Sequence, residues 1–253
     1  MIRMLRHRRL IVFSGIDGSG KSTQVQLLRE HLEACGWETE VVWTRLEWTT
    51  LWESAKRLER ITAPLNWLLG RHRPAPQEGG PPVDAGTMFS PGPATTPTAQ
   101  LRRRSALLTH AWVCVVAAVH ARAQARTVSA ASGPQKVVIC DRYTLDAAVA
   151  LRRRYGKERS FAPQVMLLKL LSPRPLLAWH VDVPAAVAQK RKDEGFSDAE
   201  LKLLVELYRA QRERLGWRRV DGTRPAAEVA EEITQACDTA LGRIARGFAS
   251  CGP

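Results

Sequence analysis

The hydrophobic positions along the chain follow two periods, one typical of buried strands and one typical of helices. Short apolar runs predict strands at Leu10–Ser14, Glu40–Thr44, Lys136–Cys140, Leu176–Asp182 and Trp217–Val220. Between these runs, apolar residues recur every three or four positions and predict helices at about 21–35, 49–69, 100–128, 184–194, 198–214 and 225–245. This alternation predicts an α/β fold with a five-stranded parallel sheet flanked by helices.

One segment interrupts the alternation. Residues 71–98, RHRPAPQEGGPPVDAGTMFSPGPATTPT, are rich in proline and glycine, have no periodic pattern and are too long for an ordinary connection. We expect a flexible insertion between two helices of a single domain that spans residues 1–253. The alternative is a segment that covers the substrate and becomes ordered on binding.

The chain is strongly basic, with a formal net charge of +13 that is carried mostly by arginine and spread along its length. Runs of basic residues occur at Arg3–Arg9, Arg102–Arg104 and Arg152–Arg154. Such a charge suits a phosphorylated small molecule, a nucleic acid or an acidic membrane surface. The runs lack interleaved aromatic residues and no recognised nucleic-acid-reading module accompanies them, so nucleic acid is the less favoured partner.

Neither the start of the chain nor its apolar tracts predict membrane association. The opening MIRMLRHRRLIVFSG superficially resembles a signal peptide, but its apolar part is short and runs directly into a glycine-rich segment. The longest apolar tract, residues 106–125, is broken by His110 and His120 and predicts a buried helix. The cysteines have no paired spacing, which predicts reduced thiols in the cytoplasm and no zinc site.

The segment SGIDGSGKST, residues 14–23, carries the clearest chemical signal. It matches G-x-x-x-x-G-K-[ST], with Gly15, Gly20, Lys21 and Ser22 at the fixed positions, between a predicted strand and a predicted helix. Glycines let backbone N–H groups converge on phosphate oxygens, and the helix start adds its own N–H groups and dipole. Lys21 is expected to reach the terminal phosphates of a nucleoside triphosphate, and the Ser22 hydroxyl to ligate Mg²⁺.

A second motif, KVVICDRY at residues 136–143, is a buried strand that ends in polar residues. Ligands bind at the carboxyl ends of strands in parallel sheets, so Asp141 and Arg142 are expected to face the same site. Asp141 is suited to hold Mg²⁺, directly or through water, and Arg142 to hold a second phosphate through two parallel hydrogen bonds.

Together with HVDVPAAVAQKRKDEG (residues 180–195) and VDGTRPAAEVAEEI (residues 220–233), these motifs resemble, in the same order, those of the thymidylate-kinase-like branch of the nucleoside monophosphate kinases. The resemblance implies a P-loop NTPase three-layer sandwich. It also implies transfer of the γ-phosphoryl group of ATP to a small-molecule phosphate acceptor, with Mg²⁺ as cofactor. A homodimer formed through the long helices is implied as well.

The resemblance also assigns roles to individual residues. ATP would be held by the loop and helix start, namely Gly15, Gly18, Ser19, Gly20, Lys21, Ser22 and Thr23. Arg191 would close over the ATP phosphates from a helix and lid at residues 184–196, and Thr223 and Arg224 would line the adenine.

On the acceptor side, the resemblance places Arg45 and Arg142 on the acceptor phosphate, with Tyr143 beside them. Asp17 would meet the acceptor's sugar hydroxyl or a magnesium-bound water. Lys21, Asp17, Arg142 and Arg191 would form the catalytic set.

Some positions differ from the family pattern and leave alternatives open. Gly18 stands where part of the family has arginine, so the lid cluster Lys190–Lys192 is either the source of the missing cation or an exposed basic helix end. Asp146 replaces a serine and either accepts a hydrogen bond from a different acceptor or caps the helix that follows. Val149–Leu151 replace a run that reads thymine.

The acceptor is therefore either a nucleoside monophosphate, dTMP or a relative, or a non-nucleotide such as a sugar or specialised metabolite. A nucleotide-dependent nucleic-acid binder is the third possibility.

Overall fold

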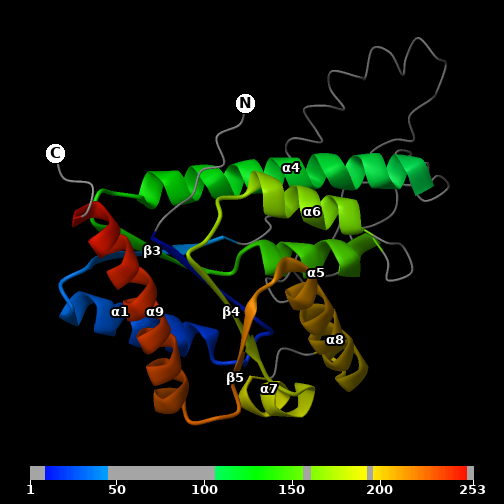
Figure 1. The fold of residues 1–253 in the computed structure, drawn as a ribbon. Coiled ribbons are helices and arrows are strands. Elements are labelled where there is room, and N and C mark those ends of the chain that lie inside the picture. The colour runs from blue at the N-terminus through cyan, green and yellow to red at the C-terminus, as the bar shows by residue number, and fades with distance from the viewer. Residues whose placement is uncertain (1–8, 45–105, 156–160, 193–195, 250–253) are drawn as a thin grey trace, which may run out of the picture.

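The structure of the chain, a computed structural model, describes residues 9–44, 106–155, 161–192 and 196–249 (Figure 1). Its strands are β1 (Leu10–Ser14), β2 (Glu38–Trp43), β3 (Lys136–Asp141), β4 (Leu177–Asp182) and β5 (Arg218–Asp221). Its helices are α1 (Lys21–Ala34), α4 (Ala106–Ala131), α5 (Thr144–Tyr155), α6 (Ala162–Leu171), α7 (Ala185–Arg191), α8 (Asp198–Leu215) and α9 (Ala226–Ala249).

The strands form one five-stranded sheet in the order β2-β3-β1-β4-β5, and every pair is parallel. The central strand β1 pairs with β3 through Leu10 and Val138 and with β4 through Ile11 and Leu177. Each residue of β1 is buried, as expected for a parallel strand covered on both faces. The predicted α/β fold with a five-stranded parallel sheet is confirmed.

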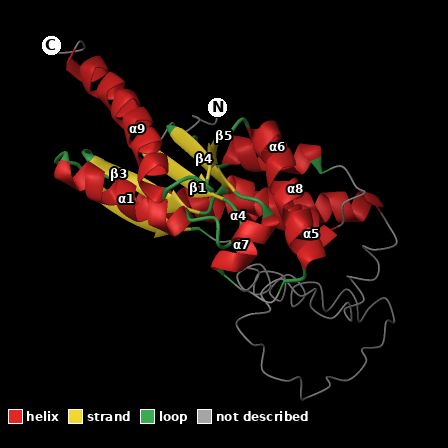
Figure 2. Ribbon diagram, turned by 90° about the horizontal axis from the view of Figure 1, so that it is seen from below, coloured by secondary structure: helices red, strands yellow, loops and turns green. Residues whose placement is uncertain are grey.

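Alternate residues of the central strand point into two separate cores. Ile11 and Phe13 pack under α1 and α9, whereas Leu10 and Val12 pack under the helices of the opposite face. Figures 1 and 2 show the resulting layers, with α1 and α9 on one side of the sheet and α4, α5, α6 and α8 on the other. Because strand side chains alternate with a period of two, a single strand supplies both cores.

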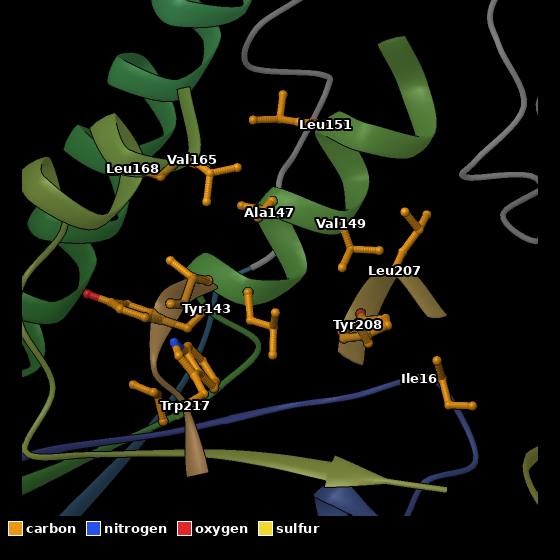
Figure 3. Packing of buried hydrophobic residues seen from close by; sticks show 14 of the residues in the cluster. Ile16, Tyr143, Ala147, Val149, Leu151, Val165, Leu168, Leu207, Tyr208 and Trp217 are labelled. Atoms are coloured by element: carbon orange, nitrogen blue, oxygen red, sulfur yellow. The ribbon is translucent and has the colours of Figure 1, made fainter. Parts of the chain in front are cut away.

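Helix α5 lies between α6 and α8 in the larger core (Figure 3). Ala147 lies near Val165 of α6, while Val149 points toward Leu207 of α8. These contacts attach α6 and α8 to the end of β3 through α5.

The five strands lie where the sequence predicts them, to within a few residues at their ends. Helices α5 and α6 were not predicted. The apolar residues of α5 are buried on more than one side, whereas α6 is apolar on its exposed side too, with Leu170 56% exposed. Neither segment therefore has the one-sided spacing that marks an amphipathic helix. The predicted helix 49–69 and the insertion 71–98 lie outside the described residues.

Among the described residues, one helix, α4, has the length and the apolar composition that crossing a membrane requires. Its outer face exposes apolar side chains, among them Leu107, Leu108, Val115 and Val119. Its inner face packs on the sheet side and against α6, but only a third of its most apolar stretch is buried. The prediction of a buried helix therefore holds for one face of α4 and is wrong for the other.

Two leucines on α6 provide a direct test of the core. Leu168 has no exposed surface, whereas Leu170 on the same helix is 56% exposed. We expect Leu168→Ala to lower the free energy of unfolding by about 2–5 kcal/mol, because it leaves a cavity in the larger core beneath α6. Leu170→Ala is the matched control and should change it by less than about 0.5 kcal/mol. Urea denaturation measures both, and equal effects would contradict this packing.

Candidate functional site

The connection between β1 and α1 is a tight loop, called here the glycine loop (residues 15–20). Gly18 and Gly20 have φ angles of 79° and 93°, in the left-handed region that favours glycine. A Cβ atom at Gly18 would lie 2.5 Å from the carbonyl oxygen of Ala188, so the loop and α7 meet backbone to backbone. The loop therefore curls at the carboxyl end of the central strand with α7 directly against it.

Lys21, the first residue of α1, is buried, with 5% of its surface exposed. Its ammonium donates to the carbonyl oxygen of Ile16 at 2.7 Å and lies 3.7 Å from a carboxylate oxygen of Asp17. Burial lowers the pKa of Lys21, and the neighbouring Arg142 lowers it further, while Asp17 opposes them. The loop thus folds around a desolvated cation whose environment would be improved by an added anion.

Ser22 and Asp141 connect the start of α1 to the end of β3. The Ser22 hydroxyl donates to Oδ2 of Asp141 at 3.2 Å, while Oδ1 of the same carboxylate is buried without a hydrogen-bond partner. Burial raises the pKa of Asp141, and the charges of Lys21 and Arg142 counteract this in part. A hydroxyl beside a carboxylate with an unsatisfied oxygen is a donor set that fits Mg²⁺.

Arg142 follows β3 with a φ of 70°, and it is the residue other than glycine with positive φ in the described part of the chain. Its backbone N–H donates to the Phe13 carbonyl at 2.8 Å, and its guanidinium contacts Asp17 and Oδ1 of Asp146, the latter at 3.3 Å. Burial alone would lower the pKa of Arg142, but Asp146, Tyr208 and Asp17 raise it above its ordinary value. With its backbone in this strained conformation, Arg142 points its guanidinium, which stays positively charged, toward Asp17 of the glycine loop.

Asp146 lies beneath this arginine as an acceptor for several donors. It accepts from the Tyr143 backbone N–H at 3.0 Å, from the Tyr208 hydroxyl at 2.7 Å and from Ser14, besides Arg142. The capping alternative placed Asp146 ahead of a helix, but Asp146 is the third residue of α5. From within this first turn it accepts from the N–H of Tyr143, the residue directly before the helix, and so pairs a donor at the helix start. The carboxylate is buried and its oxygens are occupied by donors of the chain itself.

Tyr143 is placed in the core beneath the start of α5 (Figure 3). Its side chain is 1% exposed, and its hydroxyl donates to the carbonyl oxygen of Pro173 at 2.7 Å. The ring supports the strand end that carries Arg142, and its polar atom is already paired within the chain.

Of the residues expected to hold ATP, Arg191 lies next to the glycine loop, whereas Thr223 and Arg224 bond to acidic residues of β5 and α9. Arg191, at the end of α7, donates to the Gly222 carbonyl at 2.9 Å and lies beside Gly20 of the glycine loop. Thr223 donates through its backbone and its hydroxyl to Asp221, at 2.9 and 2.7 Å. Arg224 instead turns toward α9, where Glu228 and Glu232 accept from it.

The structure therefore groups Asp17, Lys21, Ser22, Asp141, Arg142 and Arg191 around the glycine loop. Ser19 is buried in the loop with its hydroxyl unpaired, Gly15 is buried, and Thr23 is exposed on α1. Arg45 lies outside the described residues, as do residues 193–195 of the predicted lid.

Sequence reasoning missed several polar residues that support the site. Ser14 and Tyr208 hold Asp146, but each sits in a pattern that predicts only a buried strand or an apolar helix face. His120 of α4 is also buried, with Nε2 unpaired, and burial lowers its pKa to about 4. Only the fold brings these residues together, since they come from separate elements.

Comparison with known proteins gives the chain no family. No family model matches it, and no curated protein matches it.

The raised pKa of Asp141 makes a prediction about stability. Between the ordinary pKa of 3.8 and the higher pKa of Asp141 in the folded chain, the folded state binds more protons than the unfolded state. The wild type therefore loses stability as the pH rises from 3.8 through the folded-state pKa. We expect Asp141→Asn to unfold at a higher urea concentration than the wild type at pH 7 without metal, because it removes a desolvated charge.

Added Mg²⁺ should stabilise the wild type and leave the Asp141→Asn variant unchanged, because binding to the folded state alone raises stability. Glu231→Gln, an exposed position on α9, is the control and should alter stability by less than about 0.5 kcal/mol. A destabilised, magnesium-responsive Asp141→Asn variant would contradict the assignment.

Proposed function

We propose that this chain is an ATP-dependent phosphotransferase of the P-loop NTPase type, which transfers the γ-phosphoryl group of ATP to a nucleoside monophosphate, dTMP or a relative. The observation that carries the proposal is the buried Lys21 ammonium inside a loop of left-handed glycines, with the Ser22–Asp141 pair beside it. The desolvated charges of Lys21 and Asp141 each cost free energy in the unliganded chain. A bound polyphosphate would offset the first cost and its cation the second.

On the ATP side, the glycine loop and the start of α1 would direct backbone N–H groups at the phosphates. Lys21 would exchange the Ile16 carbonyl for phosphate oxygens, which gain more from a full positive charge. Arg191 lies beside Gly20 and would likewise turn from the Gly222 carbonyl to the phosphates. Thr223, in the connection after β5, would line the adenine.

Ser22 and Asp141 would hold Mg²⁺, which supplies neutralisation of the charge on the β- and γ-phosphates. The remaining work is positioning. Arg142, with Arg45, would hold the acceptor so that its oxygen forms a bond to the γ-phosphorus as the bond to ADP breaks. Lys21 and Arg191 would stabilise the negative charge that spreads over the transferred group, and Asp17 would orient the acceptor or a water bound to the cation.

A second candidate, a kinase of the same fold for a non-nucleotide small molecule, is favoured by a specific observation. Val149 and Leu151, which replace the thymine-reading run of the resembling family, are buried in the core around α5. Asp146 is occupied by donors of the chain. A base bound here would therefore meet few of the polar partners expected for thymine.

One experiment separates the candidates. The purified chain is incubated with ATP, Mg²⁺ and a panel of nucleoside monophosphates, nucleosides and sugars, and ADP release is followed. Turnover with dTMP or another monophosphate supports the first candidate, and turnover only with a non-nucleotide supports the second. No turnover, together with salt-sensitive DNA binding, would favour a nucleic-acid binder instead.

Lys21→Ala tests the loop directly. We expect acceptor-dependent turnover to fall by at least about 100-fold, because a preorganised charge on the transferred group is lost. Thermal melting without ATP shows whether the variant is folded, so that a loss of turnover can be assigned to the missing charge. Lys169→Ala, an exposed position on α6, is the matched control and should keep the full rate. Full activity in Lys21→Ala would overturn the proposal.

We also propose that the chain forms a homodimer through the exposed apolar face of α4. Val115 is 52% exposed there and Leu107 79% exposed, on the longest described helix. Val115→Glu should convert a dimer to a monomer, because a charge buried in an apolar contact is strongly unfavourable. Light scattering on the purified chain measures the mass. A monomeric wild type would exclude this interface, and Glu231→Gln on α9 serves as the control that should leave the mass unchanged.

A further inference from the structure

A cluster of metal-binding side chains lies at the end of α1 opposite the glycine loop. His31 is in the last turn of α1, Cys35 follows as its C-terminal cap, and Asp238 belongs to α9. Helices α1 and α9 lie side by side on one face of the sheet (Figure 1). His31 is about 15 Å along the helix axis from Lys21, so the cluster is separate from the candidate functional site.

The three side chains present a nitrogen, a sulfur and an oxygen at close range. Nε2 of His31 is 3.1 and 3.0 Å from the two carboxylate oxygens of Asp238 and 3.8 Å from Sγ of Cys35. One ligand atom from each residue lies within 4.8 Å of the other two. A zinc ion, with bonds of about 2.0–2.3 Å to such atoms, fits between them after small side-chain movements.

The chemistry of the set favours zinc over Mg²⁺ or Ca²⁺. Thiolate and imidazole ligands suit zinc, whereas Mg²⁺ and Ca²⁺ prefer oxygen alone. His31 and Cys35 are four residues apart, so one helical turn places them on the same face. The side chains of His31 and Asp238 are 34% and 48% exposed, and Cys35 is exposed, which leaves room for ion entry and for a water ligand.

The helices that carry the cluster are held firmly by the core beneath it. Leu28 and Leu32 of α1 and Ile233, Cys237 and Leu241 of α9 are buried in the same core. His31 and Asp238 therefore stand on packed helices, and Cys35 is the cap directly after α1, which limits the rearrangement that binding requires. An exposed hydrogen-bonded His–Asp pair by itself adds little stability, so the fold does not need the cluster.

We propose that His31, Cys35 and Asp238 form a binding site for a zinc-class divalent cation that joins α1 to α9. Binding displaces the proton of the Cys35 thiol and leaves the remaining His31 ring proton on Nδ1, so that Nε2 can coordinate. A water molecule completes a four-coordinate site. The sequence predicted no zinc site because the cysteines have no paired spacing. Asp238 is far from His31 along the chain, and only the α1–α9 contact brings the two together.

The test uses the full chain, reduced, treated with a chelator and free of nucleotide. Zn²⁺ is titrated against a chromophoric chelator, and Co²⁺ is added in parallel to look for a thiolate-to-cobalt charge-transfer band. We expect tight binding of one ion, with the band present. His31→Ala, Cys35→Ser and Asp238→Asn should each weaken binding by at least about tenfold, and Cys35→Ser should abolish the band.

Two variants serve as controls. Cys114→Ser on α4 removes another cysteine that is not buried, and Asp141→Asn removes the candidate Mg²⁺ ligand. Both should keep wild-type zinc affinity. Absence of tight binding, or equal binding by the wild type and Cys35→Ser, would overturn the site and leave only a His–Asp ion pair. The readout needs no turnover, so it is independent of the proposed function.

Thermal melting without metal checks that each variant folds. Because the cluster is exposed, the metal-free melting temperatures should match that of the wild type. Zinc should raise the melting temperature of the wild type more than that of Cys35→Ser, because only the intact site binds the ion to the folded state.

Discussion

The arrangement around the glycine loop depends on the contacts that the buried Lys21 ammonium makes with its acceptors. A desolvated cation has to be surrounded by acceptors, and here the Ile16 carbonyl and Asp17 provide them. Asp17 in turn accepts from Arg142, which links the loop to the end of β3. The loop conformation, the acidic residue within it and the strained arginine are thus parts of one charge-balanced unit built on adjacent parallel strands.

A second unit, centred on Asp146, gives the first one its rigidity. This carboxylate joins β1, the start of α5 and α8 through Ser14, Tyr143 and Tyr208. Buried polar networks of this kind fix geometry because each member loses much when a partner leaves. Arg142 is held between Asp17 and Asp146, so the strand end, the loop and α8 constrain the same guanidinium.

The sheet and the residues of the glycine loop could be predicted from the sequence because their signals are local: short apolar runs, and glycines, a lysine and a serine at fixed spacing. The position of Tyr143 could not, because its hydroxyl bonds to Pro173, which is 30 residues away along the chain. The pairing of Arg224 with Glu228 and Glu232 does have a local signal, four and eight residues along the chain, but the family resemblance assigned Arg224 to the adenine instead. Helices α5 and α6, the Asp146 network and the His31–Cys35–Asp238 cluster depend on tertiary contacts, which spacing along the chain does not encode.

The close approach of Gly18 to Ala188 has a mechanical consequence. No side chain separates the two backbones, so any residue larger than glycine at position 18 would push α7 outward. A long cationic side chain at this point and a docked α7 are mutually exclusive, and the chain has the docked helix with Arg191 at its tip. A shift of α7 at Ala188 toward the loop would therefore press directly on the loop backbone, with no side chain between them to adjust.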